Sequence, residues 1–167
     1  MHRFGIAGHC VLDPDAREFV ASACSALIVD AQRAGKVAAV SALAEGADTM
    51  FAEAALSAGA TLEIVRPYHG FEREFDTARL RRRYRVLVDA AHRETALPFG
   101  SRSTRAYEAA MRRIADSCDV LVAAWDGTPP RGTGGTADTV RYAESIGRRV
   151  VHLDVVRHRV IVRGSAG

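Results

Sequence analysis

The chain has 167 residues, of which 48% are hydrophobic, and its formal net charge is +3. This length and composition predict one globular domain with a substantial core, and the lack of any run of about 18 apolar residues argues against a membrane span. The cysteines lack any Cys-x-x-Cys pair, which argues against a disulfide framework or a zinc site and favours reduced thiols in a cytoplasmic protein; they are Cys10, Cys24 and Cys118.

The first part of the chain alternates strand-like and helix-like segments. Apolar runs predict strands at residues 3–8, 37–42 and 61–65. The helix between the first two begins after Asp13 and ends at Gly35, because Asp caps a helix N-terminus and Gly its C-terminus. Its predicted buried face consists of Phe19, Val20, Ala23, Leu27 and Ala31. A second helix is predicted over residues 47–58.

The pattern is weaker between residues 69 and 101, where we predict one helix over about 71–91 and then a loop. A helix beginning near Ser103 then leads to a continuous apolar strand at 120–125. A glycine-rich turn follows, and then a helix whose apolar face is Ala137, Val140, Ala143 and Ile146. A fifth strand is predicted at 149–153, and residues 160–162 form either a short sixth strand or a tail.

Strands that alternate with helices at this spacing predict an α/β fold. We expect a single doubly wound Rossmann-like domain over residues 1–167, with a mostly parallel sheet of five or six strands. Ligands of such sheets bind outside the carboxyl ends of the strands, at the switch in strand order. Four loops share that edge, and the unusual residues gather in them; the loops are 8–10, 44–46, 67–69 and 126–136.

The turn after the 120–125 strand is rich in glycine and threonine: Gly132, Thr133, Gly134, Gly135 and Thr136. Glycines before a helix leave backbone N–H groups bare at the positive end of the helix dipole, which is a common phosphate site. We therefore predict phosphate binding there, with Thr136 adding a hydroxyl donor. A flexible loop with a threonine cap is the alternative.

Other candidate ligand contacts lie in the same loops; they are Gly8, His9, Gly46, Asp48, Trp125 and Gly127. Glu45 and Asp126 are carboxylates at strand ends that could bind ribose hydroxyls or act on a glycosidic bond. Five of these residues also have a simpler explanation. Glu45 and Asp48 stabilise a helix N-terminus, Gly8 and Asp126 form turns, and Trp125 fits a core.

An arginine cluster lies in the predicted 71–91 helix, comprising Arg79, Arg81, Arg82, Arg83 and Arg85. A solvated helix face explains it, although arginines also bind phosphate well. Only Tyr84 interrupts the cluster with an aromatic ring, so a nucleic-acid partner bound by this helix is the third and least favoured function. The histidines are scattered, so we expect no metal site and no resident cofactor.

Taken together, these motifs resemble the SLOG superfamily of Rossmann-like domains, which are related to the cytokinin-activating phosphoribohydrolases, and especially its small bacterial members. The resemblance extends over about residues 3–154, and its motifs are Gly8-His9, residues 43–48, residues 119–127 and residues 132–139. It implies a site for a nucleotide or nucleotide derivative, with the 132–136 turn holding phosphate. It also implies a homodimer or higher homo-oligomer.

Two functions are compatible with that resemblance. The first is a binding domain, a nucleotide sensor or carrier without turnover. The second is an N-glycosidase of a nucleoside 5′-monophosphate, in which Glu45 acts with Asp126 or Asp138. The hydrolase pattern has a proline before its glycine pair and several acids opening the helix, whereas this turn lacks the proline and has only Asp138. We therefore favour binding.

Overall fold

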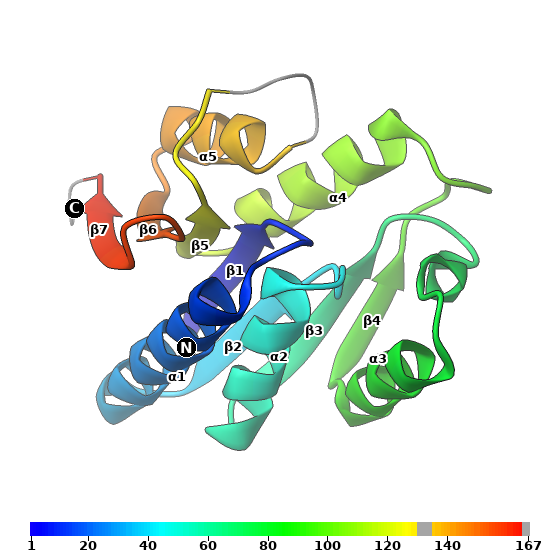
Figure 1. Cartoon of the computed structure of the whole chain (residues 1–167), viewed down its shortest axis with the longest axis horizontal. Coiled ribbons are helices and arrows are strands. Elements are labelled where there is room, and N and C mark those ends of the chain that lie inside the picture. Colours follow the sequence, from blue (N-terminus) through cyan, green and yellow to red (C-terminus); the bar gives the residue numbers. More distant parts are fainter. Residues whose placement is uncertain (130–134, 165–167) are drawn as a thin grey trace.

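The computed structural model describes residues 1–129 and 135–164, and its centre is a seven-stranded sheet (Figure 1). The strand order is β4-β3-β2-β1-β5-β6-β7, and β7 alone is antiparallel to its neighbour. The strands are β1 His2–Gly8, β2 Val37–Ser41, β3 Thr61–Arg66, β4 Arg93–Ala96, β5 Val120–Trp125, β6 Arg149–Asp154 and β7 Arg159–Arg163. The predicted α/β class and mostly parallel sheet are confirmed, with seven strands in place of five or six.

Helices cover both faces of the sheet (Figure 1). They are α1 Pro14–Ala34, α2 Ala47–Ser57, α3 Ala78–Ala90, α4 Thr104–Ser117 and α5 Thr136–Ser145. One core lies between the sheet and α1, α2 and α3, and the other between the sheet and α4 and α5. Because both faces are covered, all of β2 and nearly all of β5 are buried, as expected for parallel strands.

Local capping chemistry sets where the helices begin. The Asp13 carboxylate accepts a hydrogen bond from the Ala16 N–H at 2.8 Å, and Pro14 is the first residue of α1. Ser103 caps α4 in the same way, through the Ala106 N–H at 3.1 Å. Both starts agree with the sequence prediction.

The region between β3 and α4 differs from the single helix predicted over 71–91. It contains a short 3₁₀ helix at Phe71–Glu74, then α3, and then the unpredicted strand β4. The break lies before Thr77, whose hydroxyl accepts a hydrogen bond from the Leu80 N–H and starts a new helix. Strand β4 is polar and lies at the sheet edge, so it lacks the apolar run that marks the other strands.

Two predicted buried faces also differ from the structure. The fully buried residues of α1 form an i, i+4 row, namely Ala16, Val20, Cys24 and Ile28, while Phe19, Ala23, Leu27 and Ala31 are partly buried beside it. In α5, Ile146 is the C-cap and is 37% exposed, because the helix ends at Ser145 before that position turns inward.

Among residues 1–129 and 135–164, no helix combines the length and the apolar character that a membrane crossing requires.

The strand order changes direction between β1 and β5. Strands β2, β3 and β4 follow on one side of β1, and β5, β6 and β7 follow on the other. The chain therefore leaves β1 toward one face of the sheet and β5 toward the other, which opens a crevice at their carboxyl ends. This is where the predicted site residues Gly8, His9 and Asp126 lie.

Candidate functional site

Gly8 brings three elements together at the switch in strand order. It pairs with Ala124 of β5, and the following N–H, that of His9, donates to the Ala124 carbonyl at 3.0 Å. A Cβ at Gly8 would lie 2.4 Å from Ala47 Cβ and 3.0 Å from the Ala124 carbonyl oxygen. Glycine is therefore required here so that the start of α2 can pack against β1 and β5.

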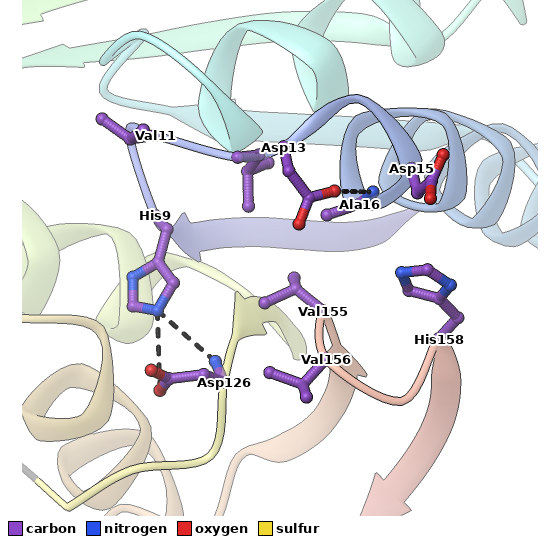
Figure 2. Close-up of a pocket in the computed structure, with 10 residues that line it drawn as sticks. His9, Val11, Asp13, Asp15, Ala16, Asp126, Val155, Val156 and His158 are labelled. Atoms are coloured by element: carbon purple, nitrogen blue, oxygen red, sulfur yellow. Dashed lines mark hydrogen bonds and ion pairs between the residues drawn. The ribbon is translucent and has the colours of Figure 1, made fainter.

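His9 and Asp126 lie opposite each other across the crevice (Figure 2). The His9 Nε2 atom is 3.6 Å from Asp126 Oδ1 and accepts a hydrogen bond from the Asp126 N–H at 3.4 Å. The Thr128 N–H and hydroxyl both donate to Asp126 Oδ1, at 3.0 Å and 2.7 Å. These two hydrogen bonds, with a smaller effect of His9, lower the pKa of Asp126, so the group is a carboxylate at neutral pH.

A pocket of about 410 Å³ opens beside this pair (Figure 2). Its walls come from the loop after β1, the first turn of α1 and the β6–β7 turn; they include Val11, Leu12, Asp13, Asp15, Ala16, Val155, Val156 and His158. Three carboxylates line it, counting Asp126, and Asp13 already occupies an N-terminal N–H of α1. The pocket therefore suits hydroxyl groups, amines or a base better than it suits a phosphate.

The N-terminus of α5, which follows β5, differs in this respect. Its N-cap is Gly135, which makes no side-chain hydrogen bond, and Thr136 is the first helical residue. A glycine cap supplies no side-chain acceptor of its own, so an acceptor from outside, such as a phosphate oxygen, can take that place. The rest of the predicted phosphate turn, Gly132, Thr133 and Gly134, lies outside the described residues.

No protein-family model and no curated protein sequence matches the chain, but solved structures do. DNA processing protein A (DprA) from Streptococcus pneumoniae is 19% identical with a TM-score of 0.64; the match covers 91% of this chain and 50% of that one. DprA from Helicobacter pylori is 16% identical with a TM-score of 0.62, covering 90% and 64%. The molybdenum cofactor carrier protein of Chlamydomonas reinhardtii is 19% identical with a TM-score of 0.58, covering 92% and 76%.

The chain shares the Rossmann-like fold of these structures. This agrees with the resemblance seen in the sequence motifs. At these identities the likeness concerns the fold, and the chain spans only half the length of the pneumococcal DprA.

The β2–α2 loop packs beneath the loop after β1. Gly46 has φ +87°, and the next N–H, that of Ala47, donates to the His9 carbonyl at 3.2 Å. Asp48 is buried behind this loop, so desolvation raises its pKa to about 7, opposed by the N–H groups of Ala44 and Ala42. Its Oδ2 atom has no hydrogen-bond partner in the part of the chain that the structure describes.

Glu45 belongs to the same loop and is exposed, but it does not line the 410 Å³ pocket that contains Asp126. The charge of its carboxylate helps to raise the pKa values of Cys10 and Arg83. Burial raises the pKa of the Cys10 thiol to about 11, and the carboxylates of Asp48 and Glu45 add to that shift. This thiol is therefore protonated at neutral pH.

The remaining candidates follow β5 or lie in α5. Trp125 is buried, stacks on His152 with ring centroids 3.9 Å apart, and donates its indole N–H to the Thr128 carbonyl at 3.1 Å. It thus packs in the core and holds the start of the loop, where Gly127 has φ +79°. Asp138 lies in a small cavity between α4 and α5, away from the pocket of Asp126. The candidate carboxylates Glu45, Asp126 and Asp138 do not share one described pocket.

Sequence reasoning missed the β6–β7 turn as a wall of the pocket. Val155, Val156 and His158 line the same pocket as His9 because β6 lies beside β5 and β7 folds back on β6. His158 has φ +49°, a conformation that non-glycine residues rarely adopt, and its ring stacks on Phe19 of α1. No local sequence pattern connects this turn with the loop after β1.

Proposed function

We propose that the domain binds a phosphorylated nucleoside or a related nucleotide derivative at the carboxyl edge of β1 and β5, as a sensor or carrier. One observation carries most weight. The same connection that leaves β5 begins with the ionised Asp126 on a pocket wall and ends at an α5 N-terminus whose cap, Gly135, has no side chain. Acceptors for hydroxyl groups and donors for an anion thus belong to one loop.

In this proposal the phosphate and the nucleoside of the ligand bind to chemically different groups of the protein. The phosphate oxygens accept hydrogen bonds from the N–H groups at the start of α5 and from the Thr136 hydroxyl. The ribose hydroxyls donate to the Asp126 carboxylate, and His9 supplies a further polar contact. The base packs against the apolar part of the pocket at Val155 and Val156.

The similar structures support ligand binding of this general kind. The Chlamydomonas protein is a carrier of the molybdenum cofactor, and the Helicobacter DprA binds single-stranded DNA. Self-association, which the sequence resemblance implies, stays a prediction and can be tested by light scattering.

The first experiment is a thermal-stability screen with AMP, CMP, GMP, ATP, NAD, ADP-ribose and ribose 5-phosphate. A bound ligand stabilises the folded state by RT ln(1 + [L]/Kd), so a ligand at a thousandfold excess over Kd adds about 4 kcal/mol. We expect at least one phosphorylated nucleoside to raise Tm. Failure of every ligand to do so would contradict the proposal.

Gly135→Asp tests the phosphate half directly. The Gly135 backbone is extended, with φ −85°, and a Cβ there meets no atom within 4 Å, so an aspartate fits and supplies its own helix cap. We expect Tm without ligand to rise slightly, because an aspartate N-cap is about 0.3 kcal/mol better than a glycine N-cap. We expect the ligand-induced shift to disappear, because the carboxylate competes with the phosphate. A retained shift would exclude the α5 N-terminus as the phosphate site.

Asp126→Asn tests the hydroxyl half, and Asp89→Asn, an exposed aspartate of α3, is its control. We expect only the first to weaken binding, and to weaken ribose-containing ligands more than inorganic phosphate. The same mixtures are assayed for free base. Base release that is lost in Glu45→Gln, with binding retained, would replace the carrier function by N-glycoside hydrolysis.

A further inference from the structure

A second large depression lies on the side of the sheet that α1, α2 and α3 cover, away from the pocket of Asp126. It has a volume of about 920 Å³ and extends from the first turns of α1 across α2 to α3, which lie side by side in Figure 1. We call it the arginine groove. Its lining residues are Arg17, Glu53, Thr77, Arg79, Leu80, Arg82, Arg83, Val86 and Leu87.

The charge of the arginine groove is strongly unbalanced. Arg83 is neutralised by Glu53, with its Nη2 donating to Glu53 Oε2 at 2.6 Å. Among residues 1–129 and 135–164, Arg17, Arg79 and Arg82 have no ion-pair partner. Three guanidinium groups therefore face the groove without compensation, one from α1 and two from α3.

The arrangement of these arginines fits an extended anionic chain. Arg79 and Arg82 are three residues apart, so they project from one side of α3 about one turn apart, while Arg17 stands on the opposite wall. Val86 at 60% exposure provides apolar surface on the α3 side of the groove. Tyr84 is buried, so no aromatic ring is offered there for base stacking.

We propose that the arginine groove binds the sugar–phosphate backbone of single-stranded nucleic acid without sequence preference. A nucleic-acid strand carries one charge per nucleotide and so engages both walls at once, whereas a protein would need a dense run of carboxylates to do the same. Guanidinium groups form paired hydrogen bonds with phosphate oxygens. This surface is separate from the proposed nucleotide pocket, and the proposal favours the nucleic-acid partner that the sequence had made the least favoured of three functions.

Fluorescence anisotropy with a labelled mixed-sequence single-stranded oligonucleotide tests the proposal at several salt concentrations. Three phosphate contacts predict a slope of log K against log [salt] of about −2, because each contact contributes about −0.7 for single strands. Arg79→Ala and Arg82→Ala are each expected to reduce the slope by about 0.7 and to weaken binding to all sequences alike. Both side chains are exposed, and thermal melting confirms that the variants are folded.

Arg113→Ala is the matched control, since it removes the same charge from an exposed position on α4, on the other face of the sheet. It should leave the slope unchanged. An equal effect of all three variants would mean that only net charge matters and would overturn the proposal. So would competition by polyglutamate at equal charge, which would make the groove a site for acidic protein. Loss of oligonucleotide binding in Gly135→Asp, with Arg79→Ala without effect, would place the strand at the carboxyl edge instead.

Discussion

Gly46→Ala is expected to destabilise the domain by about 3 kcal/mol or more, since it combines a disfavoured backbone conformation with a clash against fixed main chain. Gly46 has φ +87° and ψ −124°, which side chains other than glycine avoid. A Cβ there would lie 2.5 Å from both the His9 and the Cys10 carbonyl oxygens. These atoms are backbone, so they cannot rotate away as a side chain would.

Gly59→Ala separates the two causes. Gly59 follows the end of α2 and has φ +79°, but nothing lies within 4 Å of an added Cβ. The free energy of unfolding of this variant should therefore fall only by the cost of a positive φ at alanine, about 1 kcal/mol. Chemical denaturation of both variants gives the comparison. Equal losses would show that the loop after β1 moves freely and that Gly46 is not held against it.

Gly46→Ala should also weaken ligand binding at temperatures where the variant is folded, whereas Gly59→Ala should not. The His9 carbonyl is the acceptor of the Ala47 N–H, so pushing that carbonyl away moves His9 relative to Asp126. An unchanged Kd in Gly46→Ala would mean that the position of His9 is irrelevant to binding.

The buried parallel strands could be predicted from sequence because long apolar runs leave few alternatives. In β5, five of six residues are buried, and the run from Val120 to Trp125 marks it plainly. Strand β4 could not be predicted, because it is held at the sheet edge by main-chain pairing with β3 and its residues are exposed or half-buried. The break within the predicted 71–91 helix does have a local sequence signal, because Asp76 and Thr77 are residues that favour a helix N-cap and α3 begins directly after Thr77.

For the candidate site, the sequence predicts which loops meet but not which side chains share a pocket. Gly8, His9 and Asp126 end adjacent strands, so their proximity follows from the fold class alone. His158 lines the pocket because the chain turns back after β6 and β7 runs antiparallel to it, and no local sequence pattern predicts this turn. The position of Glu45 depends on the left-handed backbone at Leu43 and Gly46, and that backbone directs the loop under His9.

Asp48→Asn is expected to change the pH dependence of stability more than any other substitution of a carboxylate. Burial raises the pKa of Asp48 from 3.8 to about 7, and one pKa unit corresponds to about 1.4 kcal/mol, so the total effect is about 4 kcal/mol. Between these values the folded state keeps a proton that the unfolded state releases. The free energy of unfolding therefore falls as pH rises from about 4 to about 7 and is constant above that range.

Asparagine is neutral at every pH, so the variant should match the wild type near pH 4 and exceed its stability at pH 8. Two thiols face the carboxyl group, Cys24 from α1 and Cys10 from the loop after β1, and burial raises their pKa values to about 12 and about 11. Both stay uncharged in this range and do not contribute. Burial lowers the pKa of His152, which makes stability rise with pH, but this term is common to both proteins and cancels in their difference.

Urea denaturation at several pH values measures that difference, with Asp89→Asn as the control for loss of an exposed carboxylate. The difference between Asp48→Asn and wild type should grow between pH 4 and pH 7 and then level off. A difference independent of pH would mean that Asp48 is ionised in the folded state. Its unpartnered Oδ2 would then have to be satisfied by water or by a small displacement of the β2–α2 loop, the loop that supports His9.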